Sequence, residues 1–120
     1  MPGLTAETRV NGIPLYVPPA LHGVLPPSPC RLNFPFEHLA FLGLESFLKP
    51  GAVVFDAGCS YGVISALAAR LVGPLGRVYA FDANAEVLPA AAALWESNGL
   101  RDRVEFWNVC VGEAFGQGWS

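Results

Sequence analysis

A glycine-containing turn and two acidic residues have the types and spacing that could bind a ribose-bearing ligand. Asp56 ends a short apolar run, the turn from Gly58 to Gly62 follows it, and Asp82 follows a second apolar run. Glycine lets the backbone turn sharply and approach a ligand closely. A carboxylate placed after a strand can accept two hydrogen bonds from a ribose diol, the role predicted for Asp82. An acid at the end of an apolar strand is costly unless it orders loop amides or meets a ligand, which is the expectation for Asp56.

The surrounding pattern predicts that these residues follow the strands of an α/β fold. Strands and helices alternate in the order β-α-β-α-β, which is typical of a Rossmann-like parallel sheet of three strands. Ligands bind at the C-terminal ends of the strands in such sheets. The predicted strands are 52–55, 77–81 and 103–111, and the predicted helices are 63–71 and 84–97.

The ends of the second helix and of the third strand carry further signals. Asn84 can cap the second helix and Asn98-Gly99 can stop it. Pro89 inside the helix either delays its start by a turn or kinks it. The end of the third strand, from Asn108 to Glu113, is placed to flank a base ring.

The first part of the chain predicts a hairpin, a loop and a helix ahead of the sheet. Asn11-Gly12 is a tight-turn signal, residues 15–17 form the return strand, and Pro14 makes that strand an edge strand at best. The proline-rich stretch 18–29 predicts a loop, and 36–48 has helical periodicity. We therefore divide the chain into a hairpin and loop region, 1–35, and a partial Rossmann-like domain, 36–120.

Composition excludes several classes of protein. The chain has 120 residues, of which 52% are hydrophobic and 14% charged, and its net charge of −3 comes without a basic run, so no nucleic-acid partner is expected. Cys30, Cys59 and Cys110 are odd in number and far apart, which favours reduced thiols over a disulfide framework or a metal site. No signal peptide or membrane-spanning run is visible, so a cytoplasmic location without membrane contact is expected.

The spacing of the turn discriminates between ligands. A dinucleotide fingerprint needs G-x-G-x-x-G, whereas here Cys59, Ser60 and Tyr61 separate the two glycines. Asp56 would also repel a pyrophosphate. A ligand with a sulfonium and an amino group and no phosphate suits this turn better, although a fragment of an NAD-binding oxidoreductase stays as an alternative.

At this point the residues resemble a known family. The segment 49–112 is similar to the start of class I S-adenosylmethionine-dependent methyltransferases, and in particular to the FkbM type. The matching stretches are VVFDAGCSYG at 53–62, RVYAFDAN at 77–84, NGL at 98–100 and VCVG at 109–112. Two departures stand out: the family usually has Glu-Pro where this chain has Asp82-Ala83, and often Ala-Asn where it has Cys59-Ser60.

The resemblance implies S-adenosyl-L-methionine as cofactor and assigns its contacts. Asp56, Gly58 and Gly62 would form the loop at the methionine side, with Ser60 and Tyr61 contributing. Asp82 would hold the ribose hydroxyls. The adenosine would be lined by the remaining predicted site residues, which are Ala83, Asn84, Asn108, Val109 and Cys110.

The implied reaction is methyl transfer to an oxygen of a small molecule or sugar. No residue can be assigned as a general base, because the acceptor-facing residues of the resembled family come largely from later strands. We therefore expect a truncated cofactor-binding half, with a non-catalytic remnant or interaction module as the alternative. In the family's order the first strand lies between the second and the fourth, so self-association through an unpaired strand edge is also expected.

Four further side chains are interpreted as structural. His22 and His38 lack partners at metal-ligand spacing and are predicted to lie on the surface. Trp95 and Trp107 are predicted to belong to the core.

Overall fold

The computed structural model describes residues 6–10, 13–23, 33–34 and 48–110. The predicted helix at 36–48 and the Asn11-Gly12 turn lie almost wholly outside these residues, as does half of the loop 18–29. The N-terminal elements are β1 (Ala6–Val10), β2 (Ile13–Val17), the short 3₁₀ helix η1 (Pro19–Leu21) and β3 (Asn33–Phe34). The remaining elements are β4 (Val53–Ala57), α2 (Val63–Val72), β5 (Arg77–Phe81), η2 (Ala85–Val87), α3 (Leu88–Ser97), η3 (Arg101–Arg103) and β6 (Val104–Trp107).

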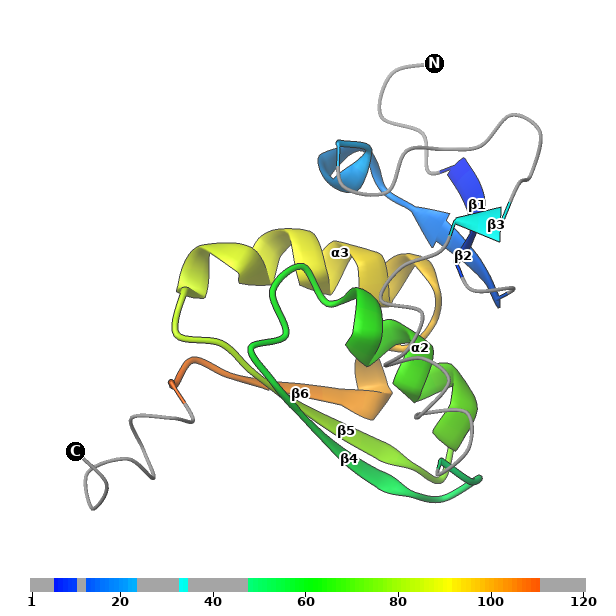
Figure 1. Cartoon of the computed structure of the whole chain (residues 1–120), viewed down its shortest axis with the longest axis vertical. Helices are drawn as coiled ribbons and strands as arrows, with labels where there is room; N and C mark the ends of the chain where they lie inside the picture. Colours follow the sequence, from blue (N-terminus) through cyan, green and yellow to red (C-terminus); the bar gives the residue numbers. More distant parts are fainter. Residues whose placement is uncertain (1–5, 11–12, 24–32, 35–47, 111–120) are drawn as a thin grey trace.

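The second group of elements forms the predicted Rossmann-like unit (Figure 1). Its three strands are parallel in the order β4-β5-β6, with Val54 opposite Val78 and Val78 opposite Val104. Each pair of neighbouring strands is joined through a helix, α2 or α3. The α/β fold class predicted from the sequence is confirmed.

Two boundaries differ from the prediction by four residues, for local reasons. Asn84 accepts a hydrogen bond from the amide of Glu86, but the turn it caps is η2, and α3 begins only at Leu88 with Pro89 in its first turn. Pro89 therefore delays the helix. The third strand was predicted to reach residue 111, yet it ends at Trp107, where the amide of Val109 folds back onto the Trp107 carbonyl at 3.0 Å.

The N-terminal hairpin forms a small sheet of its own in the order β2-β1-β3. β1 and β2 pair antiparallel with Val10 opposite Ile13, as the turn signal predicted. β2, which contains Pro14, lies at the edge, where a missing amide costs least. The parallel pairing of β1 with the two-residue β3 was not predicted.

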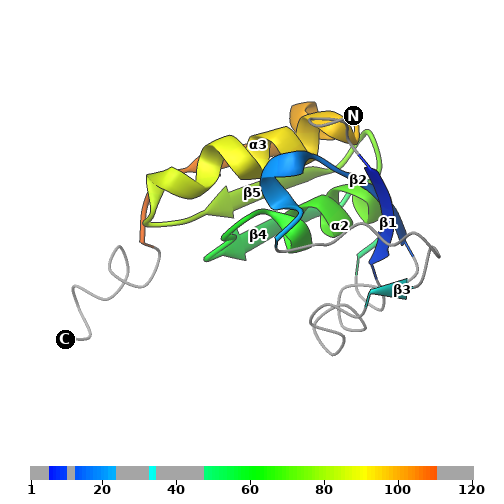
Figure 2. The ribbon, with the colours of Figure 1, turned by 90° about the horizontal axis from the view of Figure 1, so that it is seen from above.

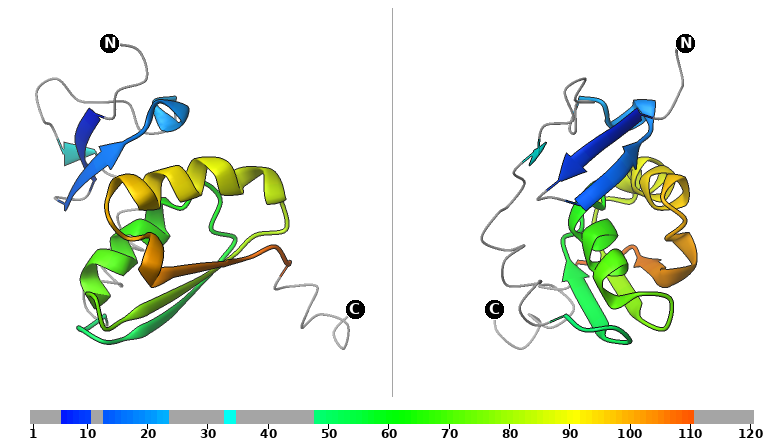
Figure 3. Two further views of the ribbon diagram at one scale, coloured as in Figure 1. Left: turned by 180° about the vertical axis from the view of Figure 1, so that it is seen from behind. Right: turned by 90° about the vertical axis from the view of Figure 1, so that its right-hand side faces the viewer.

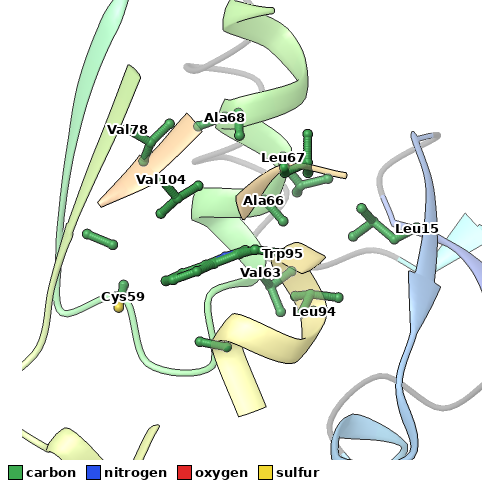
Figure 4. Close-up of a cluster of buried hydrophobic side chains, with 14 of the residues drawn as sticks. Leu15, Cys59, Val63, Ala66, Leu67, Ala68, Val78, Leu94, Trp95 and Val104 are labelled. Carbon is green, nitrogen blue, oxygen red and sulfur yellow. The ribbon is translucent and has the colours of Figure 1, made fainter. Parts of the chain in front are cut away.

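One hydrophobic core joins the hairpin to the Rossmann-like unit (Figure 4). Trp95 is its largest fully buried side chain, which confirms the structural interpretation of that residue. The hairpin region adds Leu15, Val17 and Leu21, all 0% exposed. Side chains of β2, η1, α2 and α3 thus share one apolar interior.

Asn98 links the edge strand of the hairpin to the end of α3. Its side-chain oxygen accepts from the Tyr16 amide at 2.8 Å and from Arg70 at 2.9 Å. Its amide group donates to the carbonyls of Tyr16 at 2.9 Å and Leu94 at 2.7 Å. Asn98 was predicted as a helix stop, and the structure adds this second function at the free edge of β2.

Both helices cover the same face of the parallel sheet, as Figure 2 and the two views of Figure 3 show. On the opposite face Phe55 is 69% exposed and Trp107 is 48% exposed, so the prediction that Trp107 lies in the core is wrong. Phe55 stacks on Tyr79 at 5.4 Å and on Phe81 at 6.1 Å. No described element covers this aromatic face. Within the described residues, no helix has the length and apolar character needed to cross a membrane.

We expect the 120-residue chain to self-associate at high concentration. β4 is an edge strand among the described residues, and exposed apolar side chains on an edge strand favour pairing with another chain. Light scattering should show an apparent mass that rises with concentration. Phe55→Lys should reduce this rise, because it places a charge on the edge strand. A wild-type chain that stays monomeric over the whole range would contradict the expectation.

Candidate functional site

The candidate site lies where the C-terminal ends of the three parallel strands meet. Ala57 is opposite Phe81 and Phe81 is opposite Trp107, so the segments that follow these residues leave the sheet side by side. Asp56, the turn 58–62, residues 82–84 and residues 108–110 are therefore gathered at one edge, as predicted (Figure 1). The roles assigned to these residues remain predictions.

The turn from Gly58 to Gly62, here called the glycine loop, is held by backbone hydrogen bonds. The amides of Gly58 and Cys59 both donate to the Phe81 carbonyl, at 2.7 and 2.8 Å, and the Gly62 amide donates to the Cys59 carbonyl at 2.9 Å. Three residues have positive φ angles: Gly58 at 73°, Gly62 at 80° and Ser60 at 52°. The loop thus depends on glycine at two positions and places Ser60 in a conformation rare for a residue with a side chain.

Asp82 fixes the middle of the glycine loop. One carboxylate oxygen accepts from the Ser60 amide at 2.8 Å, and the other accepts from the Asn84 amide at 2.9 Å. A carboxylate offers about four acceptor positions, so each oxygen keeps one for a ligand. The side chain predicted to hold a ribose therefore also joins the loops after β4 and β5.

Asp56 has a partner that sequence reasoning missed. Ser65 is fully buried in α2 and its hydroxyl donates to the Asp56 carboxylate at 2.6 Å. The signal was a serine at the third position of a largely apolar helix, nine positions after the acid. This bond offsets part of the cost of an acid at the end of an apolar strand.

A second missed residue lies beneath the glycine loop. The indole N–H of Trp95 donates to the Gly62 carbonyl at 2.9 Å. Figure 4 shows its ring reaching from α3 toward Cys59 and Val63. The sequence marks Trp95 as a core residue, but no spacing rule predicts which carbonyl its N–H would meet.

The residues after β6 complete the edge. The Asn108 amide group donates to the carbonyls of Asp82 and Ala83, at 3.0 and 3.1 Å. Asn108 therefore orders the loop after β5. Val109 is 39% exposed and Cys110 is half-buried, so both are reachable from solvent. Tyr61, Ala83 and Asn84 are exposed as well.

The pKa of the Cys59 thiol reflects the burial and the negative charge of the glycine loop. Burial, and then the negative charges of Asp56 and Asp82, raise the pKa of the thiol to about 12. The thiol is therefore protonated near neutral pH and is not a nucleophile there. The same two carboxylates make the loop a favourable place for a positively charged ligand group.

We predict that Cys59 resists alkylation at pH 8. A pKa near 12 leaves very little thiolate, so iodoacetamide should modify Cys59 on the order of 100-fold more slowly than the half-buried Cys110. Peptide mapping by mass spectrometry would measure both rates. Equal rates would contradict the prediction.

The same thiol makes folding sensitive to alkaline pH. In the unfolded chain the thiol ionises near 9.0, whereas the folded chain keeps its proton up to about 12. The folded state then binds more protons, so the free energy of unfolding should fall as pH rises from 9 to 12. Cys59→Ala is the control, and its stability should fall less over this range.

The described histidine and the described acids give no sign of a metal centre. His22 lies with its Nε2 3.1 Å from the Val17 carbonyl. Within residues 13–23 and 48–110, no group of three His, Cys, Asp or Glu side chains could hold a metal ion.

Comparisons with known proteins find similarity to methyltransferases. No family model matches the chain. Over 61 residues it is 40% identical to a Schizosaccharomyces pombe protein that carries the name of a ribosomal RNA methyltransferase, covering 51% of this chain and 20% of that protein. Over 62 residues it is 39% identical to a ribosomal protein L11 methyltransferase of Pelotomaculum thermopropionicum, covering 52% and 20%. The chain thus spans about one fifth of the length of these two relatives.

Solved structures give the same result. A Clostridium thermocellum protein named as an rRNA methylase matches with a TM-score of 0.59 and 30% identity, covering 61% of this chain and 39% of that protein. A SAM-dependent O-methyltransferase of Thermotoga maritima shares the fold, with a TM-score of 0.60 and 24% identity over 71% and 32%.

The fold and the matched segments are similar to a Rossmann-like methyltransferase unit. The described β4-to-β6 region matches a fragment of the class I S-adenosylmethionine-dependent methyltransferase fold. The cofactor of that class is S-adenosylmethionine.

Proposed function

We propose that this chain provides the S-adenosylmethionine-binding part of a methyltransferase. The observation that carries the proposal is which acceptors the backbone amides of the glycine loop bind. Those of Gly58, Cys59, Ser60 and Gly62 all donate to acceptors within the protein. These amides are therefore not free to cradle a pyrophosphate, which argues against NAD. Two carboxylates beside the loop instead favour the sulfonium and ammonium groups of S-adenosylmethionine.

The residues around Asp82 fit the adenosine end of the same ligand. Each carboxylate oxygen of Asp82 keeps an acceptor position for a ribose hydroxyl. Ala83, Asn84 and Val109 lie exposed around Asp82 and would line the adenine ring. Asp56 and the glycine loop would hold the methionine end, with Tyr61 beside it.

Methyl transfer requires little acid–base catalysis from the residues of this part of the fold. The sulfonium already activates the methyl carbon, and the protein mainly orients the acceptor and, where needed, removes its proton. No described side chain is assigned as that base. Through its FkbM-type sequence features we propose an oxygen of a small molecule or sugar as the acceptor.

The charge distribution supports such an acceptor over RNA, although relatives carry names of rRNA and ribosomal-protein methyltransferases. Lys49, Arg70, Arg77, Arg101 and Arg103 lie near the start of strands or at the end of α2, away from the candidate edge. Among the described side chains, those at the edge are acidic or uncharged. Phosphate binding depends mainly on Lys and Arg, so this edge is poorly suited to an RNA backbone.

Calorimetry on the 120-residue chain would test the proposal. Titrations with S-adenosylmethionine and S-adenosylhomocysteine should give binding heats, and a titration with NAD should give none. Binding of NAD alone would overturn the proposal. Absence of binding to any of the three would favour the non-catalytic alternative instead.

A further inference from the structure

We propose that Trp95 is a positioning residue that holds the glycine loop in its ligand-binding conformation. The inference rests on the proposed function, because it assigns the loop to the methionine end of the cofactor. Trp95 belongs to α3, the helix that follows β5 in the sequence. Its side chain is fully buried and would not contact the ligand directly.

The contact between Trp95 and the loop is close and directional. A Cβ atom added to Gly62 would lie 2.7 Å from the indole nitrogen and 2.8 Å from two ring carbons. The indole N–H meanwhile donates to the carbonyl of the same residue at 2.9 Å. The ring therefore fixes Gly62 by shape and by a hydrogen bond at once.

Trp95 is itself held firmly. Its side chain is 0% exposed, and the Arg101 guanidinium lies 5.6 Å from the centroid of its ring. A buried side chain without rotamer freedom transmits position well, because a shift of the ring would disturb its packed neighbours. The Gly62 end of the loop is thus held in place by its contact with α3.

The other end of the loop is held from the opposite direction. The Phe81 carbonyl binds the amides of Gly58 and Cys59, and Asp82 binds that of Ser60. The loop is thus fixed by the end of β5 at its start and by α3 at its finish. Removing the Trp95 hydrogen bond loosens the Gly62 end, whose carbonyl then keeps only the Ala66 amide as a donor, while Asp82 stays in place for the ribose.

This arrangement predicts a selective defect. Trp95→Phe keeps an aromatic ring in the core but removes the N–H donor. Its affinity for S-adenosylhomocysteine should fall about tenfold, since the Gly62 carbonyl loses one of its two donors and keeps only the amide of Ala66. Its affinity for adenosine, which lacks the amino acid part, should fall less than about threefold.

The control is a core substitution far from the loop. Val72 is fully buried in the last turn of α2, and Val72→Ala should lower stability without touching Gly62. In this variant both ligands should lose affinity in the same proportion. If Trp95→Phe also lowers both affinities equally, Trp95 is only a core residue and the inference is overturned.

Two measurements keep the test independent of ligand binding by the variant. In the ligand-free protein, hydrogen exchange at Gly62 should quicken in Trp95→Phe, while exchange at Ser60, which Asp82 holds, and in β5 stays unchanged. In the wild-type chain, the NMR signal of the Trp95 indole N–H should shift with S-adenosylhomocysteine and stay in place with adenosine.

The outcomes separate the two proposals. Uniformly faster exchange over the whole variant, or an indole signal that ignores S-adenosylhomocysteine while it binds, would overturn the assignment of Trp95. A wild-type chain that binds neither ligand would overturn the proposed function, and the exchange of the loop amides would still show whether Trp95 holds the loop.

Discussion

Gly62→Ala should destabilise the protein by about 2–5 kcal/mol, because two costs fall on one position. The backbone at Gly62 has φ of 80°, a left-handed conformation that side chains disfavour. The new Cβ would also lie 2.7–2.8 Å from the Trp95 ring, which is buried and has no room to retreat. Urea denaturation followed by circular dichroism would measure the loss.

Gly58→Ala is the matched control in the same loop. Gly58 has φ of 73° but no atom within 4 Å of its added Cβ, so this variant carries the conformational cost alone. It should lose about 1–2 kcal/mol. If the two variants prove equally stable, the close contact between Gly62 and Trp95 does not limit the loop.

Asp82→Ala should weaken binding of S-adenosylhomocysteine by about 10- to 150-fold, equivalent to about 1.5–3 kcal/mol. Part of the loss is the pair of acceptor positions proposed for the ribose. The rest arises because Ser60 and Asn84 lose the carboxylate that accepts their amides. Calorimetry on both proteins at one ionic strength would measure the ratio of the two affinities.

Glu86→Gln is the control for charge. Glu86 is an exposed acid close to the same edge, and its amide, not its side chain, is bonded to Asn84. It should bind with wild-type affinity. An unchanged affinity in Asp82→Ala would refute the role of that carboxylate, and an equal loss in Glu86→Gln would show that net charge alone is responsible.

The sheet was predictable because its strands are short apolar runs with glycine or acid at their ends. The predicted second strand, 77–81, coincides with β5. The third strand was predicted too long, because apolar residues continue past Trp107 while hydrogen bonds at Asn108 and Val109 turn the chain away. Periodicity records which residues are apolar, and such turns depend on side-chain bonds to distant carbonyls.

The candidate site was predictable in position but only partly in its connections. Asp56 and Asp82 were found because an acid after a buried strand is unusual. The bond from Ser65 and the contact of Trp95 with Gly62 were missed, because each joins residues on different elements whose distance only the fold sets. Asp56 was expected to order loop amides or to meet a ligand, and sequence reasoning did not foresee that Asp82 accepts the amide of Ser60.

The four hydrogen bonds of Asn98 have a consequence for how the protein opens. They tie both backbone groups of Tyr16 to the end of α3, and the neighbouring Leu15 and Val17 lie in the shared core. The hairpin therefore cannot detach by fraying one bond at a time, since release breaks both Tyr16 bonds and exposes apolar side chains. We therefore expect β2 and the C-terminal end of α3 to open as one cooperative unit and to protect their amides to a common extent.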